Sequence, residues 1–127
     1  MADGGLAVQK ALLAKLQSAL SCPVYDSVPQ GATYPYVTFA STDVAQEDAI
    51  NQRIERRVVS FSVWSDYKGQ TEIMEIMSDM HDALHRADLN LDNGRVVGCY
   101  VTRKATNREP DGETYQGQFI LEVLLEL

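Results

Sequence analysis

Residues 115–125 read YQGQFILEVLL, and this stretch decides the fold class. Every second residue is apolar or glycine, while Gln116, Gln118 and Glu122 between them are polar. Alternation with a period of two places the two sets of side chains on opposite faces of a β-strand. The stretch therefore predicts a strand with one face packed on a core.

Three more strands are predicted upstream of this one. Residues 59–64 alternate in the same way, residues 36–40 follow Pro35 with β-branched and aromatic side chains, and residues 96–101 are rich in valine. The polar stretch 41–52 shows little periodicity and predicts an exposed loop or hairpin tip. Residues 24–28 form either a short strand or an extended link.

Two helices are predicted by apolar residues that recur every three or four positions. The first spans residues 6–19, and its apolar stripe consists of Leu6, Leu12, Leu13, Leu16 and Leu20. The second spans residues 70–86, with the stripe Ile73, Ile76, Met77, Met80 and Leu84.

The predicted order is helix, strand, strand, helix, strand, strand. Locally connected strand pairs favour an antiparallel sheet, with both helices packed on one face. We therefore expect an α+β fold with four strands, or five if residues 24–28 join the sheet. The whole chain, residues 1–127, is expected to form one domain with a flexible start at 1–5.

The composition excludes several classes of protein. The chain has 127 residues, 45% of them hydrophobic, and a net charge of −7 from 11 basic and 18 acidic residues. Such acidity disfavours nucleic-acid binding, because phosphates must be neutralised by Lys and Arg. No segment approaches the roughly 20 apolar residues that cross a bilayer, and no N-terminal apolar run follows basic residues. We therefore expect synthesis in the bacterial cytoplasm and no membrane contact. Cys22 and Cys99 are expected to be reduced thiols, with one bridge between them as the alternative.

The pattern most suggestive of an enzyme is His81-Asp82-Ala83-Leu84-His85. Two histidines four residues apart project from the same side of a helix and could share a metal ion. Asp82 stands where a zinc protease has its catalytic glutamate, and no third ligand is marked by spacing. Solvated surface histidines are the simpler interpretation. With no nucleophile elbow and no phosphate loop, we expect no catalytic residue, no metal, no cofactor and no enzymatic activity.

Several short motifs, in order along the chain, resemble the tail-completion proteins of tailed phages, prophages and gene transfer agents. The motifs are residues 24–29 (VYDSVP), 34–37 (YPYV), 63–65 (VWS) with Gly69 and Glu72, Ala83-Leu84, and 111–117 (DGETYQG) with the last strand. The resemblance implies an α+β tail terminator or tail-to-head joining protein. Such a protein forms a ring, commonly a hexamer, that caps the tail tube and docks the connector proteins of the head.

Assembly proteins of this kind act through complementary surfaces. The mixed charges of the polar stretch suit a head-to-tail contact between copies, and aromatic residues opposite the core face are further interface candidates. The candidate interface residues are Asp43, Glu47, Asp48, Arg53, Glu55, Arg56, Trp64 and Tyr100. The expected partners are further copies in the ring, the tail tube protein and the head–tail connector or adaptor proteins, at the head-proximal end of the virion tail.

Three alternatives stay open at this point. The chain could be a head-side adaptor or connector of the neck, with different neighbours. It could be a small metal-dependent enzyme that uses His81 and His85. It could also be an acidic regulatory binding module of the host, which would leave the ordered motifs unexplained.

Overall fold

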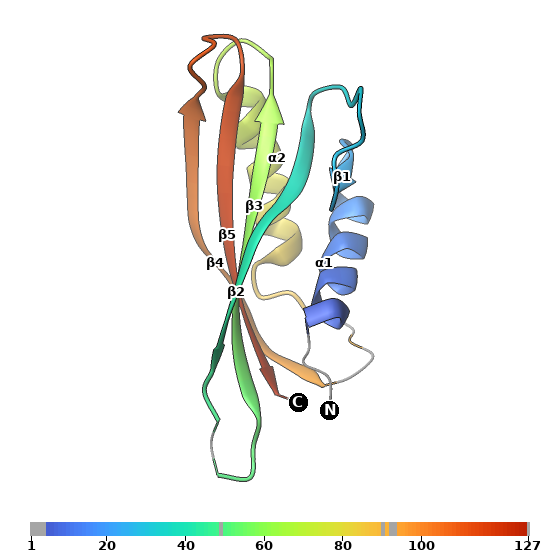
Figure 1. Cartoon of the computed structure of the whole chain (residues 1–127), viewed down its shortest axis with the longest axis vertical. Helices are drawn as coiled ribbons and strands as arrows, with labels where there is room; N and C mark the ends of the chain where they lie inside the picture. Colours follow the sequence, from blue (N-terminus) through green and yellow to red (C-terminus); the bar gives the residue numbers. More distant parts are fainter. Residues whose placement is uncertain (1–4, 49, 90, 92–93, 127) are drawn as a thin grey trace.

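The computed structural model describes residues 5–48, 50–89, 91 and 94–126, and it has the predicted α+β fold (Figure 1). Two helices and five strands follow one another as α1 (Gly5–Ala19), β1 (Val24–Tyr25), β2 (Tyr36–Gln46), β3 (Ile54–Ser65), α2 (Thr71–Leu84), β4 (Arg95–Arg108) and β5 (Tyr115–Glu126). The strands form one sheet in the order β1-β2-β3-β5-β4. The predicted flexible start at 1–5 lies outside the described residues except for Gly5, which begins α1.

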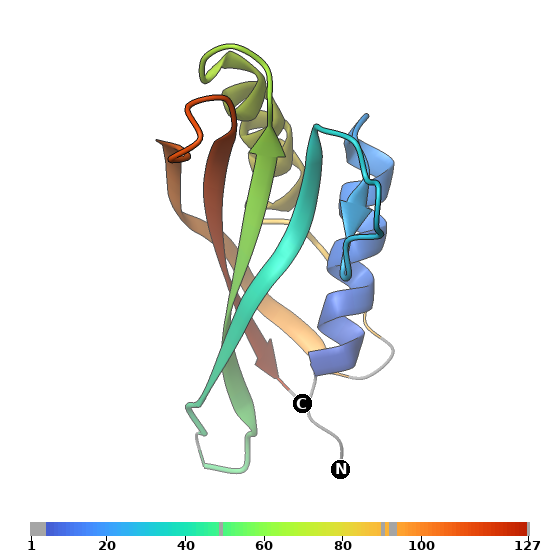
Figure 2. The same cartoon turned by 45° about the horizontal axis from the view of Figure 1, so that its top comes forward.

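The fifth strand of the sheet is β1, so the five-stranded alternative is correct. The four long strands pair antiparallel as expected. β1 instead runs parallel to β2, with Val24 beside Val37 and Tyr25 beside Thr38. The parallel pair arises because residues 26–35 carry the chain back along the sheet before β2 begins. β1 lies between α1 and β2 (Figure 2).

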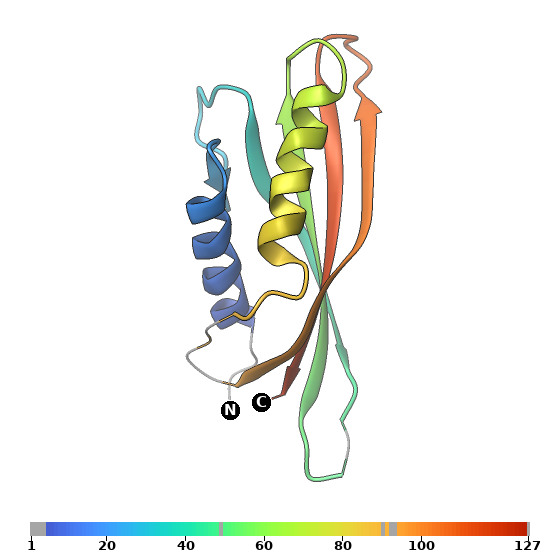
Figure 3. The ribbon, with the colours of Figure 1, turned by 180° about the vertical axis from the view of Figure 1, so that it is seen from behind.

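Both helices cover the same face of the sheet, as predicted (Figure 3). The alternation in β5 is confirmed, because the six residues at odd positions from Tyr115 to Leu125 are all buried. They meet the buried side of α2, formed by Ile73, Met77, Met80 and Leu84. Each fully buried large apolar side chain stabilises the fold by about 1.5–3 kcal/mol.

The apolar stripe predicted for α1 is partly wrong. The buried residues are Val8, Leu12 and Leu16, while Leu6 is 69% exposed. Successive residues are rotated by about 100° around the helix axis, so Leu6 points about 100° away from the mean direction of the buried Leu12 and Leu16. Leu6 is therefore at the margin of the buried side, in the first turn.

The hairpin formed by β2 and β3 is longer than the sequence predicted. Residues 41–46, expected within an exposed loop, continue β2 and pair with residues 55–60 of β3. Residues 41–48 are nevertheless all exposed. Alternation fails here because neither face of this part of β2 is covered. The hairpin projects beyond the ends of both helices (Figures 1 and 3).

α2 also ends earlier than predicted. His85 adopts an extended conformation with φ −69° and ψ 120°, which stops the helix at Leu84. Among the described residues, no helix has the length and apolar character needed to cross a membrane.

Candidate functional site

The projecting hairpin carries six of the eight candidate interface residues. Arg56 is the centre of its charges, since its Nη2 lies 2.9 Å from Glu47 Oε1 and its Nε lies 3.1 Å from Glu122 Oε1. The Nε contact does not have hydrogen-bond geometry, so it acts electrostatically. Both Arg56 and Glu47 are about 40% exposed, and ion pairs in such positions contribute only about 0–1 kcal/mol to stability. These charges are therefore free to rearrange when a partner approaches.

Asp48, Arg53 and Asp43 have different environments on the same hairpin. Asp48 Oδ1 accepts a hydrogen bond from the backbone N–H of Ile54 at 3.1 Å, which helps to close the turn. Arg53 is one-third exposed and lies 3.5 Å from Glu55. Asp43 is exposed and forms no ion pair within the described part of the chain. Asp43 thus has an unneutralised carboxylate near the edge of the sheet.

Glu55 is buried, with 1% of its surface exposed. Its Oε1 accepts hydrogen bonds from Arg57 Nε at 3.2 Å and Nη2 at 3.0 Å. Both side chains lie on the helix-facing side of β3, because they alternate in register with Val59 and Phe61. Glu55 therefore presents no surface to a partner in the isolated chain, and removing it would leave a buried guanidinium with less compensation.

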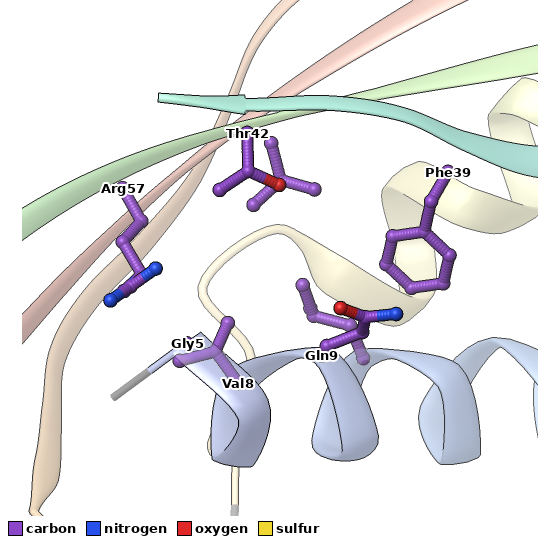
Figure 4. Close-up of a pocket in the computed structure, with 8 residues that line it drawn as sticks. Gly5, Val8, Gln9, Phe39, Thr42 and Arg57 are labelled. Carbon is purple, nitrogen blue, oxygen red and sulfur yellow. The ribbon is translucent and has the colours of Figure 1, made fainter. Parts of the chain in front are cut away.

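Arg57 also lines a small hollow of about 130 Å³ between the sheet and the start of α1. Figure 4 shows Phe39, Thr42 and Arg57 pointing from the strands toward α1, with Phe39 above Gln9. The hollow is about the size of one side chain and contains no pair of groups suited to acid–base chemistry. It does not resemble a substrate pocket.

Ile50 is the apolar residue that the sequence interpretation overlooked. It is 91% exposed in the turn of the hairpin, and Val44 on β2 is 47% exposed. A large apolar side chain at a projecting tip is a typical anchor for a partner protein. A single isoleucine within a polar stretch was the only signal for it in the sequence.

Trp64 and Tyr100 are not brought together with the charged hairpin residues. Trp64 pairs with Tyr36 at the other end of the β2–β3 ladder. Tyr100 is 41% exposed on β4, three strands away from Asp43 in the same row of the sheet. Its ring lies 6.1 Å from that of His85.

Tyr36 is the centre of an aromatic cluster that the sequence did not reveal. Its ring is stacked on Tyr34 at 5.3 Å and tilted against Tyr25 at 5.8 Å. Burial, and then the neighbouring Tyr34, raise the pKa of Tyr36. The cluster depends on the parallel pairing of β1 with β2, so alternation within single strands could not predict it.

The two histidines make their polar contacts with β4. Their rings stack at 4.7 Å, but His85 Nδ1 accepts the backbone N–H of Val101 at 3.1 Å, and His81 Nδ1 accepts from Lys104 Nζ at 3.2 Å. Burial, Lys104 and His85 lower the pKa of His81. An ammonium beside His81 repels a cation, and no third ligand is grouped with the pair among the residues described. This arrangement disfavours the metal-dependent enzyme.

The matches to known proteins include a family model and a solved structure. The family model described as Tail completion protein gp17 matches residues 6–126. A solved chain from a structure described as the virion of a native gene transfer agent particle matches with a TM-score of 0.89 and 25% identity, and the match covers 100% of both chains. No curated protein matches in sequence.

Proposed function

The chain belongs to the tail completion protein gp17 family and is a structural protein of a phage-type virion, and from this we propose that it caps the tail tube and joins it to the head. In this proposal, copies form a ring, most simply a hexamer, at the head-proximal end of the tail. One side of the ring contacts the last layer of tube protein, and the other contacts the connector proteins.

The observation that carries the proposal is the match over the full length to a chain of a gene transfer agent virion. The whole fold is shared, which supports the same class of role for this domain. The geometry agrees with a role in assembly, since the titratable groups around His81 and Glu55 are engaged in structural contacts.

We assign the main contact with a partner to the hairpin. Its tip combines an exposed apolar residue, Ile50, with a rim of weakly held charges at Glu47 and Arg56. An apolar centre with a polar rim is the usual composition of a protein interface. Asp43, Asp48 and Arg53 extend this rim, whereas Trp64 and Tyr100 belong to separate surfaces that would face other neighbours.

Electron microscopy of particles produced without the gene tests the function. Filled heads accompanied by unattached tails of uncontrolled length are expected, because nothing would stop the tube or dock it. Unattached tails of normal length would instead indicate a joining role that follows length control, as for a head-side adaptor. Intact, infectious particles would overturn the proposal.

A matched pair of variants tests the hairpin assignment. Ile50→Asp removes the apolar anchor without touching the core, and the gene-deleted strain carrying it should release unattached tails. Leu6→Asp, which changes another exposed apolar residue on the first turn of α1, is the control and should assemble normally. Normal particles from Ile50→Asp would show that the tip is not the contact.

A further inference from the structure

The sheet has an uncovered edge at each end. On one side, β1 pairs only with Val37 and Thr38 of β2, so residues 39–46 pair with β3 but have no strand on their outer side within the described chain. On the other side, the loop after α2 occupies part of β4, where Arg86 N–H donates to Cys99 O at 2.6 Å and Val101 N–H donates to His85. Residues 102–108 of β4 lie beside β5 and have no strand on their outer side among those described. Unpaired edges are templates for another strand.

The directions of the two edges are complementary. β2, β3, β5 and β4 form three successive antiparallel pairs, so β4 runs antiparallel to β2. If a second copy is placed beside the first in the same orientation, its β2 lies antiparallel to β4 of the first. A head-to-tail contact of this kind repeats around a ring without a change of pattern.

The charges of the two edges are opposite. The β2 side carries Asp43, which is exposed, and the free part of β4 carries Arg103, which is also exposed and forms no ion pair in the described chain. Both side chains lie on the face of the sheet that the helices do not cover. Asp43 pairs with Val58, and Val58 pairs with Glu122. Arg103 pairs with Ile120, which lies on the same face of β5 as Glu122. Opposite charges across a strand pair stabilise it.

The helix-facing sides of the edges also fit together. Beside β4, the residues Met74, Met77, Ser78, Lys104 and Thr106 line an open hollow of about 290 Å³, where Met74 is 55% exposed. Val44 faces the helix side of β2, because it pairs with the buried Arg57, and it is 47% exposed. A β2 strand added beside β4 would therefore bring an apolar side chain toward α2 of the neighbour, and both exposed apolar groups would be covered.

We propose that copies of this chain join by edge pairing, with residues 41–46 of β2 in one copy adding antiparallel to residues 102–108 of β4 in the next. This inference rests on the proposed ring and specifies how the ring is held together. Neighbouring copies must be shifted along the strand direction. Without a shift, Asp43 of one copy would meet Tyr100 of the next, where the loop after α2 already covers the edge of β4. Closed sheets require such a stagger.

Disulfide cross-linking in particles tests the pairing directly. Antiparallel addition of residues 41–46 to residues 102–107 places Asp43 opposite Ala105, which pairs with Gln118 on the same face of the sheet. Asp43→Cys with Ala105→Cys, in a Cys22→Ala background, should therefore give a ladder of multimers on non-reducing gels after mild oxidation of purified particles. Asp43→Cys with Lys10→Cys is the control, because Lys10 is an exposed residue of α1 away from both edges. A ladder with the first pair only supports edge pairing. No ladder, or equal ladders from both pairs, overturns it.

Charge reversal gives an independent measurement that does not rely on thiols. Asp43→Arg and Arg103→Asp should each lower the yield of infectious particles by about tenfold or more, since two like charges are then diagonal neighbours on the same face at every contact of the ring. The double variant should recover most of that loss. Reversals with no effect, or losses that simply multiply, would contradict the pairing while leaving the function intact. Intact particles after gene deletion would refute the function itself before any variant is made.

Discussion

Replacement of Gly117 by alanine measures how closely α2 approaches the sheet. A Cβ at this position would lie 2.6 Å from Ile73 Cγ2, 3.2 Å from Met77 Sδ and 3.4 Å from Val63 Cβ. Non-bonded carbon atoms are most stable at about 3.5–4.0 Å. Ile73 is fully buried, so it cannot turn into solvent to make room. The added methyl group must therefore displace α2 or force Ile73 out of its rotamer.

The expected cost follows from two opposing terms. Overpacking in a well-packed core costs about 1–3 kcal/mol, whereas removing a glycine from a strand returns about 0.5–1 kcal/mol. The sulfur of Met77 is adaptable and adds little. We therefore expect Gly117→Ala to lower the free energy of unfolding by about 1–2 kcal/mol.

Urea unfolding of the purified chain, followed by the fluorescence of Trp64, is a suitable assay because the sequence contains 1 tryptophan. The midpoint should fall while the slope stays constant. A double-mutant cycle with Ile73→Ala supplies the control. Ile73→Ala alone should cost about 2–5 kcal/mol, and the two changes together should cost at least about 1 kcal/mol less than their sum. Unchanged or increased stability of Gly117→Ala, with additive effects in the cycle, would refute the close packing of α2 on β5.

Three further predictions concern stability and protonation. Leu12→Ala should cost about 2–5 kcal/mol in urea unfolding, because Leu12 is fully buried, whereas Leu6→Ala should change stability by less than about 0.5 kcal/mol. The backbone N–H and hydroxyl of Thr114, and then the N–H of Glu113, lower the pKa of Asp111. The contribution of Asp111 to stability is therefore present at neutral pH and disappears as the pH falls through its lowered folded pKa, so Asp111→Ala should destabilise at pH 7 and lose its effect in strong acid. Lys104→Gln should raise the pKa of His81 in an NMR titration without restoring it fully, because burial is the larger cause of its lowering.

A specific result would contradict each of these three predictions. Equal losses from the two leucine variants would show that the buried side of α1 is misassigned. An Asp111→Ala effect that is the same at neutral and acidic pH would mean that the turn does not depend on the carboxylate. The folded state disfavours protonated His81, so stability should decrease as the pH falls through about 6.5. If Lys104→Gln left both this dependence and the His81 pKa unchanged, the contact between the two side chains would be ruled out.

The strands and helices that face the core could be predicted from sequence because burial imposes a period on them. β5 alternates over its full length, and the stripe of α2 is correct. Where burial stops, the period stops as well. Residues 41–46 belong to a strand, but with both faces exposed they carry only the composition of a loop.

The candidate site was harder to predict because it depends on contacts between distant segments. The sequence analysis treated Glu55 as a surface residue like the other charged residues of the hairpin. In the strand, however, Glu55 is buried and shares a face with Val59 and Phe61. Alternation through β3 could have shown this if the strand had been extended back to Ile54. The tyrosine cluster and the two open edges needed the strand order, which local patterns do not contain.

The outer half of β2, residues 41–46, should open locally more easily than the rest of the sheet. Its backbone pairs on one side only, and no buried side chain from residues 41–46 anchors it to the helices. Segments of this kind open locally at a free energy far below that of global unfolding. Backbone amides of this segment should therefore exchange with solvent while those of β5 remain protected. In the proposed ring, a neighbouring copy would order the hairpin as it binds, so that assembly is coupled to the folding of this segment and leaves the core unchanged.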